Sequence, residues 1–291
     1  ARDRGDHAYA LALARALERN RDDEAARSLL LTLRESSPED VEINLELARL
    51  AAERHDVTEA ARFYHNALYG PWSADRADAR REVRVELVRF LLAHQQSARA
   101  LSELMALTSD LPDRPDAHAQ AGALFAQAGD DEHALEQFRR ALRSAPNDAA
   151  ALTGAGQAAF RLGQYAVART YLRRAPRGAD GDTLDVADRV LADDPLASRI
   201  GIAERRRRLA SDVEYGWRRL SECAPGSADE AGLLRDAYAL AKHPASDQDE
   251  IEAGVDLVTR IGHRLVDSCP PVTPRDRALV LIGRAHGIAA P

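Results

Sequence analysis

Apolar and small residues between positions 115 and 148 fall on two short runs with helical spacing. Each run places its side chains on one side of a helix, because residues three and four apart lie on the same face. Gly129 separates the runs and Pro146 follows the second, so the pattern predicts a helix, a tight turn and a second helix. The residues of the two runs are Ala121, Gly122, Phe125, Ala134, Phe138, Ala141 and Leu142.

The following stretch of chain repeats this pattern with an offset of 34 residues. The recurring pairs are Gly122 and Gly156, Gly129 and Gly163, Ala134 and Ala168, and Ala141 and Ala175. A fixed period of this length predicts helical hairpins that stack in a row, each burying its apolar face against its neighbours.

The 34-residue unit has small residues at its seventh, eighth, twentieth and twenty-seventh places, aromatic residues at its eleventh and twenty-fourth, and proline at its thirty-second. This pattern resembles the tetratricopeptide repeat family. The resemblance implies an all-α fold, a superhelical solenoid of helix-turn-helix repeats. In such a fold Ala and Gly let adjacent helices approach, and we expect Phe125 and Phe138 to fill the gaps between them.

The same frame extends towards the N-terminus, with repeats starting near residues 7, 41, 81, 115 and 149. It requires one insertion of six residues, near the segment GPWSADR. The residues in frame are Leu13, Ala14, Leu17, Ala26, Leu30, Leu33 and Pro38 in the first repeat, Leu47, Ala48, Ala51, Ala60, Tyr64, Ala67 and Leu68 in the second, and Leu87, Leu91, Ala100, Leu104, Leu107 and Pro112 in the third.

The fifth repeat departs from the pattern at Pro176 and runs into a Gly, Pro and Asp cluster that predicts a domain boundary. We therefore expect a repeat array over residues 1–182 and a helical C-terminal segment over 183–291, acting as a cap or a small domain. Its predicted helices start at Thr183, near Ile202, at Ser227 with Glu230 completing a capping box, near Asp247, and at Thr273 followed by Pro274. Ile202, Leu209, Val213, Trp217 and Leu220 form one stripe of the second of these helices.

The charge balance and the distribution of apolar residues argue against two kinds of partner, nucleic acid and a lipid bilayer that the chain would span. The chain has 291 residues, 40 basic and 47 acidic, and a net charge of −7. Neither half is basic, so we expect no nucleic-acid partner. No stretch of 18 apolar residues occurs, so we expect no membrane span in this chain. Because the chain begins at Ala1 and its only methionine is Met105, we expect that its native start is missing, and that it is either cytoplasmic or the soluble part of an exported or anchored protein.

Candidate chemistry is sparse. The nine histidines form no pair or motif with metal-ligand spacing, and no nucleophile motif or phosphate loop appears, so we expect no metal, no cofactor and no catalytic residues. Cys223 and Cys269 belong to no CxxC pair. A disulfide and two unpaired thiols both remain open, and the frequent burial of free cysteine favours unpaired thiols.

The family resemblance implies a binding surface. In this family the first helix of each repeat lines a concave groove, and its second, fifth, ninth, twelfth and thirteenth places point towards a ligand. Carried onto this sequence, the groove residues are Leu11, Arg15, Glu42, Leu45, Arg49, Glu82, Val85, Arg89 and Arg161. A row of three arginines beside Leu, Leu and Val suits a peptide that carries carboxylates.

Two other interpretations bear on these residues. Each arginine can instead pair with a neighbouring glutamate, namely Glu42, Glu46, Glu82 or Glu86, and mixed charge along helix faces favours that pairing. The repeat proteins that hold the C-terminal carboxylate of chaperones use lysine and asparagine in this groove. The repeats of this chain contain no lysine, so we do not expect that type of clamp.

The predicted function is non-catalytic: a scaffold that binds a protein or peptide segment in the groove of the repeat array. One alternative is a self-associating structural subunit of an envelope or secretion-type assembly, a homo-oligomer that uses the stripe around Trp217. Another is an enzyme with a site in the C-terminal segment, where Asp256, His263 and Asp267 are the candidate residues.

Overall fold

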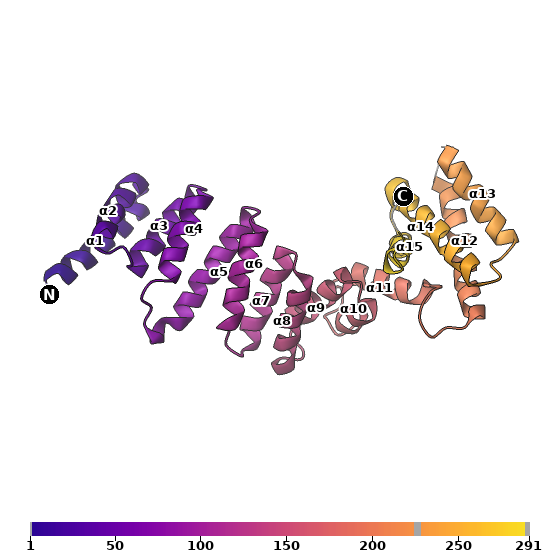
Figure 1. The fold of residues 1–291 in the computed structure, drawn as a ribbon, viewed down its shortest axis with the longest axis horizontal. Coiled ribbons are helices and arrows are strands. Elements are labelled where there is room, and N and C mark those ends of the chain that lie inside the picture. Colours follow the sequence, from indigo (N-terminus) through magenta and orange to yellow (C-terminus); the bar gives the residue numbers. More distant parts are fainter. Residues whose placement is uncertain (1, 224–227, 289–291) are drawn as a thin grey trace. The chain divides into compact units, whose positions relative to one another are not determined.

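A computed structural model describes residues 2–223 and 228–288, and these residues form helices and no strand. The predicted all-α fold is confirmed. The helices are α1 (Arg2–Arg19), α2 (Asp23–Ser36), α3 (Val41–Glu53), α4 (Val57–Leu68), the short 3-10 helix η1 (Ala74–Arg76), α5 (Ala77–Ala93), α6 (Ser97–Ser109), α7 (Pro115–Ala128), α8 (Asp131–Ser144), α9 (Ala149–Arg161), α10 (Tyr165–Leu172), α11 (Gly181–Asp193), α12 (Ile202–Cys223), α13 (Ala228–Lys242), α14 (Gln248–Ser268) and α15 (Pro274–Ala285) (Figure 1).

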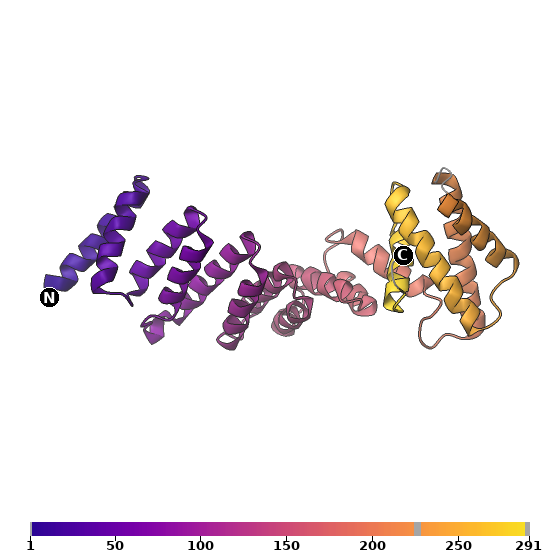
Figure 2. The same ribbon diagram turned by 45° about the horizontal axis from the view of Figure 1, so that its top comes forward.

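The chain divides into two compact units, residues 1–137 and 138–291, and the division falls inside α8. In the first unit α1 packs on α2, α3 on α4 and α5 on α6, and each pair contacts the next through its second helix. Two views of the ribbon show these successive hairpins (Figure 1 and Figure 2). The sequence-based boundary at residue 182 stays a prediction.

Backbone conformation marks every repeat. One residue in the turn between the two helices of each repeat has a positive φ, and these residues are Arg21, His55, Gln95, Gly129 and Gly163. They lie 34, 40, 34 and 34 residues apart, which is the predicted period with its single six-residue insertion. A left-handed residue ends the first helix and redirects the chain, and glycine adopts that conformation without steric cost. Only Gly129 and Gly163 signal this turn in the sequence.

Aspartate side chains cap the starts of three helices of the first unit, α2, α3 and α4. Asp22, Asp40 and Asp56 each accept a hydrogen bond from a backbone N–H in the first turn of the helix that follows. Helix α7 instead begins with Pro115, whose missing N–H costs nothing at that position. Helix α5 starts at Ala77, four residues before the predicted start of its repeat, so η1 and this extra turn take up part of the insertion.

The predicted core of the second and third repeats is confirmed, since all of their in-frame residues from Leu47 to Leu107 are buried. Small residues allow the close packing: Ala48, Ala60 and Ala100 have no exposed surface. Leu13, an in-frame residue of the first repeat, is 42% exposed and does not belong to the core.

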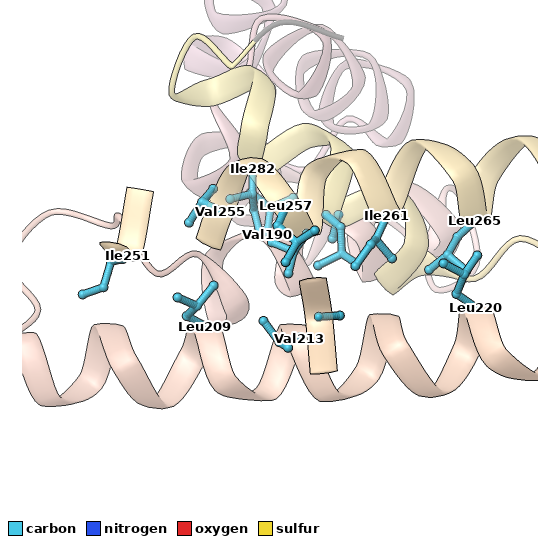
Figure 3. Close-up of a cluster of buried hydrophobic side chains, with 14 of the residues drawn as sticks. Val190, Leu209, Val213, Leu220, Ile251, Val255, Leu257, Ile261, Leu265 and Ile282 are labelled. Carbon is cyan, nitrogen blue, oxygen red and sulfur yellow. The ribbon is translucent and has the colours of Figure 1, made fainter. Parts of the chain in front are cut away.

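In the second unit one apolar core runs from α10 to α15 (Figure 3). Gly156 fills its predicted role as a close-packing site, because a Cβ at that position would lie 2.5 Å from Leu172 Cγ. The predicted stripe on α12 is only partly correct. Leu209, Val213 and Leu220 are buried, whereas Ile202 and Trp217 are 45% and 40% exposed.

The predicted C-terminal helices are present. Asp247 caps α14, and Thr273 with Asp276 forms a capping box at the start of α15. The predicted cap at Ser227 lies outside the described residues.

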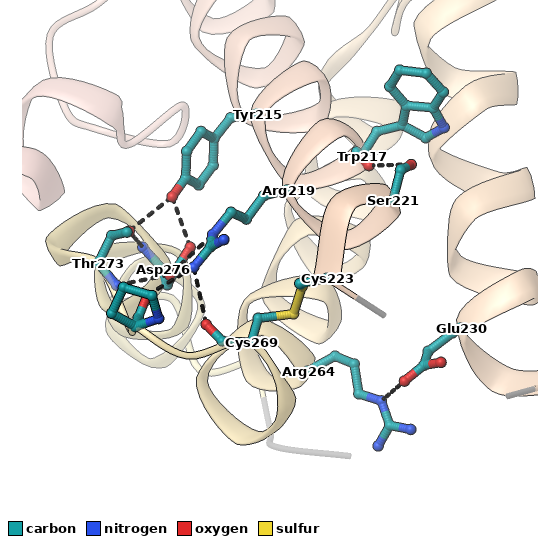
Figure 4. The surroundings of a disulfide bond; sticks show 11 residues. Tyr215, Trp217, Arg219, Ser221, Cys223, Glu230, Arg264, Cys269, Thr273 and Asp276 are labelled. Carbon is teal, nitrogen blue, oxygen red and sulfur yellow. Dashed lines mark hydrogen bonds and ion pairs between the residues drawn. A yellow bond between two sulfur atoms is a disulfide. The ribbon is translucent and has the colours of Figure 1, made fainter. Parts of the chain in front are cut away.

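The interpretation of the cysteines as unpaired thiols is wrong, because Cys223 and Cys269 form a disulfide (Figure 4). It ties the end of α12 to the loop that precedes α15. Next to it, Arg219 donates to the backbone oxygens of Cys269 at 3.0 Å and Pro271 at 2.7 Å, and Tyr215 donates to Asp276 at 2.7 Å. The bridge was not predictable from spacing, because burial alone is compatible with either state.

We expect the double variant Cys223→Ser, Cys269→Ser to unfold more easily, by about 4 kcal/mol, because the bridge closes a loop of 46 residues in the unfolded chain. Trp217 lies in the second unit, which holds the disulfide, and Trp72 lies in the first. Urea denaturation of the Trp72→Phe protein, followed by tryptophan fluorescence, therefore reports on the second unit alone. Equal stability of this protein with and without the two serine substitutions would contradict a structural role for the bridge.

Candidate functional site

All the predicted groove residues except Arg161 lie on α1, α3 and α5, the first helices of the first three repeats, and we call the side on which these residues lie the groove face. Arg15 reaches from α1 to α3, where its Nε lies 2.6 Å from Glu46 and an Nη 3.1 Å from Glu42. Arg49 repeats the arrangement from α3 to α5, with two nitrogens each 2.9 Å from the two oxygens of Glu86. Arg15 and Arg49, both at a ninth place, thus each bind the glutamate at the sixth place of the next repeat.

Local electrostatics stabilise the second of these pairs. Tyr64 donates to Glu86 at 2.7 Å. Burial alone would raise the pKa of Glu86, but the hydrogen bonds from Arg49 and Tyr64 hold it below its usual value. The same contact with Glu86 raises the pKa of the Arg49 guanidinium. Arg15 and Arg49 are therefore occupied within the molecule, as the pairing interpretation expects.

The predicted apolar strip is mostly packed away. Leu11 and Val85 are 7% and 6% exposed, and Leu45 is half-buried. The fifth places therefore contribute to the contact between helices and offer little apolar surface to a ligand.

A cavity of about 760 Å³ opens on the groove face between α5 and α7. Three predicted groove residues of the third repeat line it, Glu82, Val85 and Arg89. Its apolar lining consists of Val85, Leu107, Leu111, Pro112 and Ala117. We call this cavity the α5–α7 pocket.

Most charges at the pocket are paired inside the protein. Arg81 contacts Asp78, Arg114 contacts Asp116, and Glu86 is held by Arg49 and Tyr64. Glu82 differs, because it is exposed and forms no ion pair with the described residues. Arg89 is likewise exposed and forms no ion pair with the described residues. It is the one arginine of the predicted row of three, Arg15, Arg49 and Arg89, that has no carboxylate bound to it.

Several pocket residues were not predicted from the sequence to contact a ligand. Leu111, Pro112 and Arg114 belong to the loop between α6 and α7, and Leu107 belongs to a second helix. A frame that assigns binding only to first helices carries no signal for such residues. Arg161, also predicted, is an exposed residue at the end of α9 in the second unit.

The second unit offers less support for catalysis. Asp256 pairs with Arg260 at 3.0 Å, and the buried side of α14 is apolar, with Ile251, Val255 and Ile261 in the core. A cavity of about 640 Å³ lies near the start of α15, but Asp256, His263 and Asp267 do not line it. No group of three potential metal ligands occurs among the residues that the structure describes.

Within the described ranges, no helix combines the length and apolar character needed to cross a bilayer.

Stacked helical hairpins with a ligand-sized pocket on their groove face define a helical repeat protein. The family model described as tetratricopeptide repeat matches residues 11–79, 85–148 and 132–183, more than half of the chain. The chain belongs to the tetratricopeptide repeat family. No curated protein sequence matches it.

Several solved structures are similar to the chain. YrrB, described as a TPR protein with an unusual peptide-binding site, is 19% identical over 59% of this chain and 84% of its own, with a TM-score of 0.45. A structure of MamA is 15% identical over 60% of this chain and 92% of its own, with a TM-score of 0.46. PilF of Pseudomonas aeruginosa is 19% identical over 79% and 97%, with a TM-score of 0.39.

One carboxylate near the start of the groove face makes stability depend on pH. The Oε1 atom of Glu18 is buried without a hydrogen-bond partner. Burial, and then repulsion from Glu46 and Glu53, raises the pKa of Glu18 from 4.5 to about 7. The folded chain therefore keeps this proton to a higher pH than the unfolded chain. The contribution of protonated Glu18 to the free energy of unfolding is fully present below pH 4.5 and is lost as the pH rises through about 7.

We expect Glu18→Gln to leave stability unchanged at pH 4 and to increase it at pH 8, because the amide cannot ionise. Urea denaturation of the Trp217→Phe protein, in which Trp72 of unit 1 supplies the tryptophan fluorescence, measures the difference. Glu35→Gln, at an exposed position on α2, is the matched control. An equal effect of Glu18→Gln at both pH values would contradict the assignment.

Proposed function

We propose that this chain is a non-catalytic scaffold that binds a segment of another protein in the α5–α7 pocket. The observation that carries the proposal is the pocket itself, about 760 Å³ in volume and placed on the groove face at predicted groove residues. Membership of a repeat family supports it, because stacked hairpins provide an extended, shape-stable surface for a partner.

The lining suits a peptide segment. Apolar side chains lie beside charged ones, so that a bound segment can bury an apolar side chain while its polar groups meet the rim. The charges of Arg81, Arg114 and Glu86 are already neutralised within the protein, which lowers the cost of covering them.

Filling the pocket should abolish binding. Ala117 is a half-buried lining residue on α7, and Ala117→Trp would place an indole where a partner side chain is expected. Peptides selected on the parent chain from a phage-displayed random library should lose at least tenfold in affinity for this variant, because most of their apolar contact is removed. Fluorescence anisotropy with the synthetic peptides measures the loss.

Met105→Trp is the matched control, because Met105 is 49% exposed on α6, a second helix, and does not line the pocket. Helicity and the unfolding midpoint of both variants are compared first. Selected peptides that bind the folded Ala117→Trp variant as tightly as the parent would refute the pocket as the binding site.

A second candidate function is self-association, favoured by exposed aromatic side chains in the second unit. Trp217 is 40% and Tyr238 51% exposed, although large apolar side chains are normally buried. A self-associating subunit would cover them in an isologous contact between two copies.

Sedimentation velocity over a hundredfold concentration range tests this candidate. Trp217→Ser should shift the chain towards the monomer, whereas Tyr69→Ser, at a 68% exposed aromatic residue of the first unit, should not. A parent chain that sediments as a monomer at every concentration would rule out self-association.

A further inference from the structure

A regular series of ion pairs joins successive repeats and ends at the α5–α7 pocket. We call this series the ion-pair ladder and each of its ion pairs a rung. Arg15 binds Glu46, which is 31 positions further along the chain. Arg49 binds Glu86, 37 positions on, and the additional six positions are the inserted residues. The two rungs are thus equivalent in the repeat frame, since each joins a ninth place to the sixth place of the following repeat.

The third rung lacks its carboxylate. The residue 31 positions after Arg89 is Gln120, which occupies the sixth place of the fourth repeat. A glutamine has nearly the size of a glutamate but carries no charge, so it cannot neutralise the guanidinium. Both Arg89 and Gln120 are exposed, both line the α5–α7 pocket, and Arg89 forms no ion pair with the described residues.

The completed rungs provide a template for what the third would bind. Arg49 holds the carboxylate of Glu86 with two parallel N–H···O contacts of 2.9 Å, the fork geometry that guanidinium and carboxylate favour. Arg89 is the same residue type at the same place of the next repeat, and it lines the pocket. A carboxylate on a ligand in the pocket would complete this third contact.

We propose that the partner segment carries an acidic side chain or a terminal carboxylate, which binds Arg89 where the preceding repeats supply a glutamate of the protein itself. This inference rests on the proposed function and specifies the chemistry of its partner. The apolar lining adds a second requirement, an apolar side chain next to the carboxylate, because Val85 lies one helical turn from Arg89 on α5 and Leu111 and Pro112 line the same cavity.

A variant that supplies the missing carboxylate from the protein itself tests the proposal directly. Gln120→Glu would place a carboxylate at the sixth place, as Glu46 and Glu86 are placed, where it would compete with the ligand. We expect this variant to keep or raise the stability of unit 1 and to bind acidic peptides about tenfold more weakly. Arg89→Ala should cause a similar loss, and Arg99→Ala, at an exposed arginine of α6, should cause none.

The probes are synthetic peptides from the phage selection, each compared with a version in which Asp, Glu and the C-terminal carboxylate are replaced by amides. Amide versions should bind the parent about tenfold more weakly and should bind Arg89→Ala no differently from the acidic versions. That result would establish the coupling between Arg89 and the peptide carboxylate.

Other outcomes separate this inference from the proposed function. Peptides that Ala117→Trp blocks but that tolerate the amide replacements, Arg89→Ala and Gln120→Glu would overturn the carboxylate partner while leaving the pocket as a binding site. Failure to select any peptide that Ala117→Trp blocks would overturn both.

Discussion

The register between successive repeats is the constraint on which the rest of the structure depends. A residue with positive φ ends the first helix of every repeat, at intervals of 34 residues apart from the one insertion. Because these turns recur at the same place, small residues such as Ala48 and Ala60 meet their neighbours closely enough to exclude all solvent. The same register brings the ninth place of one repeat beside the sixth place of the next, and the ion-pair ladder follows from it.

The ladder matters more for which charges remain available than for stability. Arg15 and Arg49 are 44% and 45% exposed, and ion pairs so exposed contribute only about 0–1 kcal/mol each. Their effect on binding is larger, because a guanidinium already held by Glu46 or Glu86 cannot accept a ligand without breaking that contact. Counting arginines along the groove therefore overstates its capacity for anions, whereas the pairing leaves one accessible position at Arg89.

The repeat fold could be predicted from the sequence because it depends on a period, and the period survives in the small residues and in Gly129 and Gly163. Features that depend on unique contacts could not. Leu13 and Trp217 follow helical periodicity but are exposed, since periodicity gives a face and not its partner. The Cys223–Cys269 bridge depends on a contact between two cysteines that lie 46 positions apart in the sequence. Glu82, Val85 and Arg89, which are predicted groove residues, line the pocket, whereas its loop residues lie outside the first helices to which the repeat frame assigns binding.

The six inserted residues preserve the register and still alter the surface. Helix α5 begins four residues early, so its added turn brings Asp78 close to the pocket while Arg49 still meets Glu86. Arg76, next to that turn, reaches back to Glu42 at 3.4 Å, a glutamate that Arg15 also contacts. The insertion thus adds positive charge to the completed part of the ladder and lengthens one wall of the pocket. An array built on a constant period becomes specific through such local departures, and in this chain the longer α5 and the neutral Gln120 fall at the same cavity.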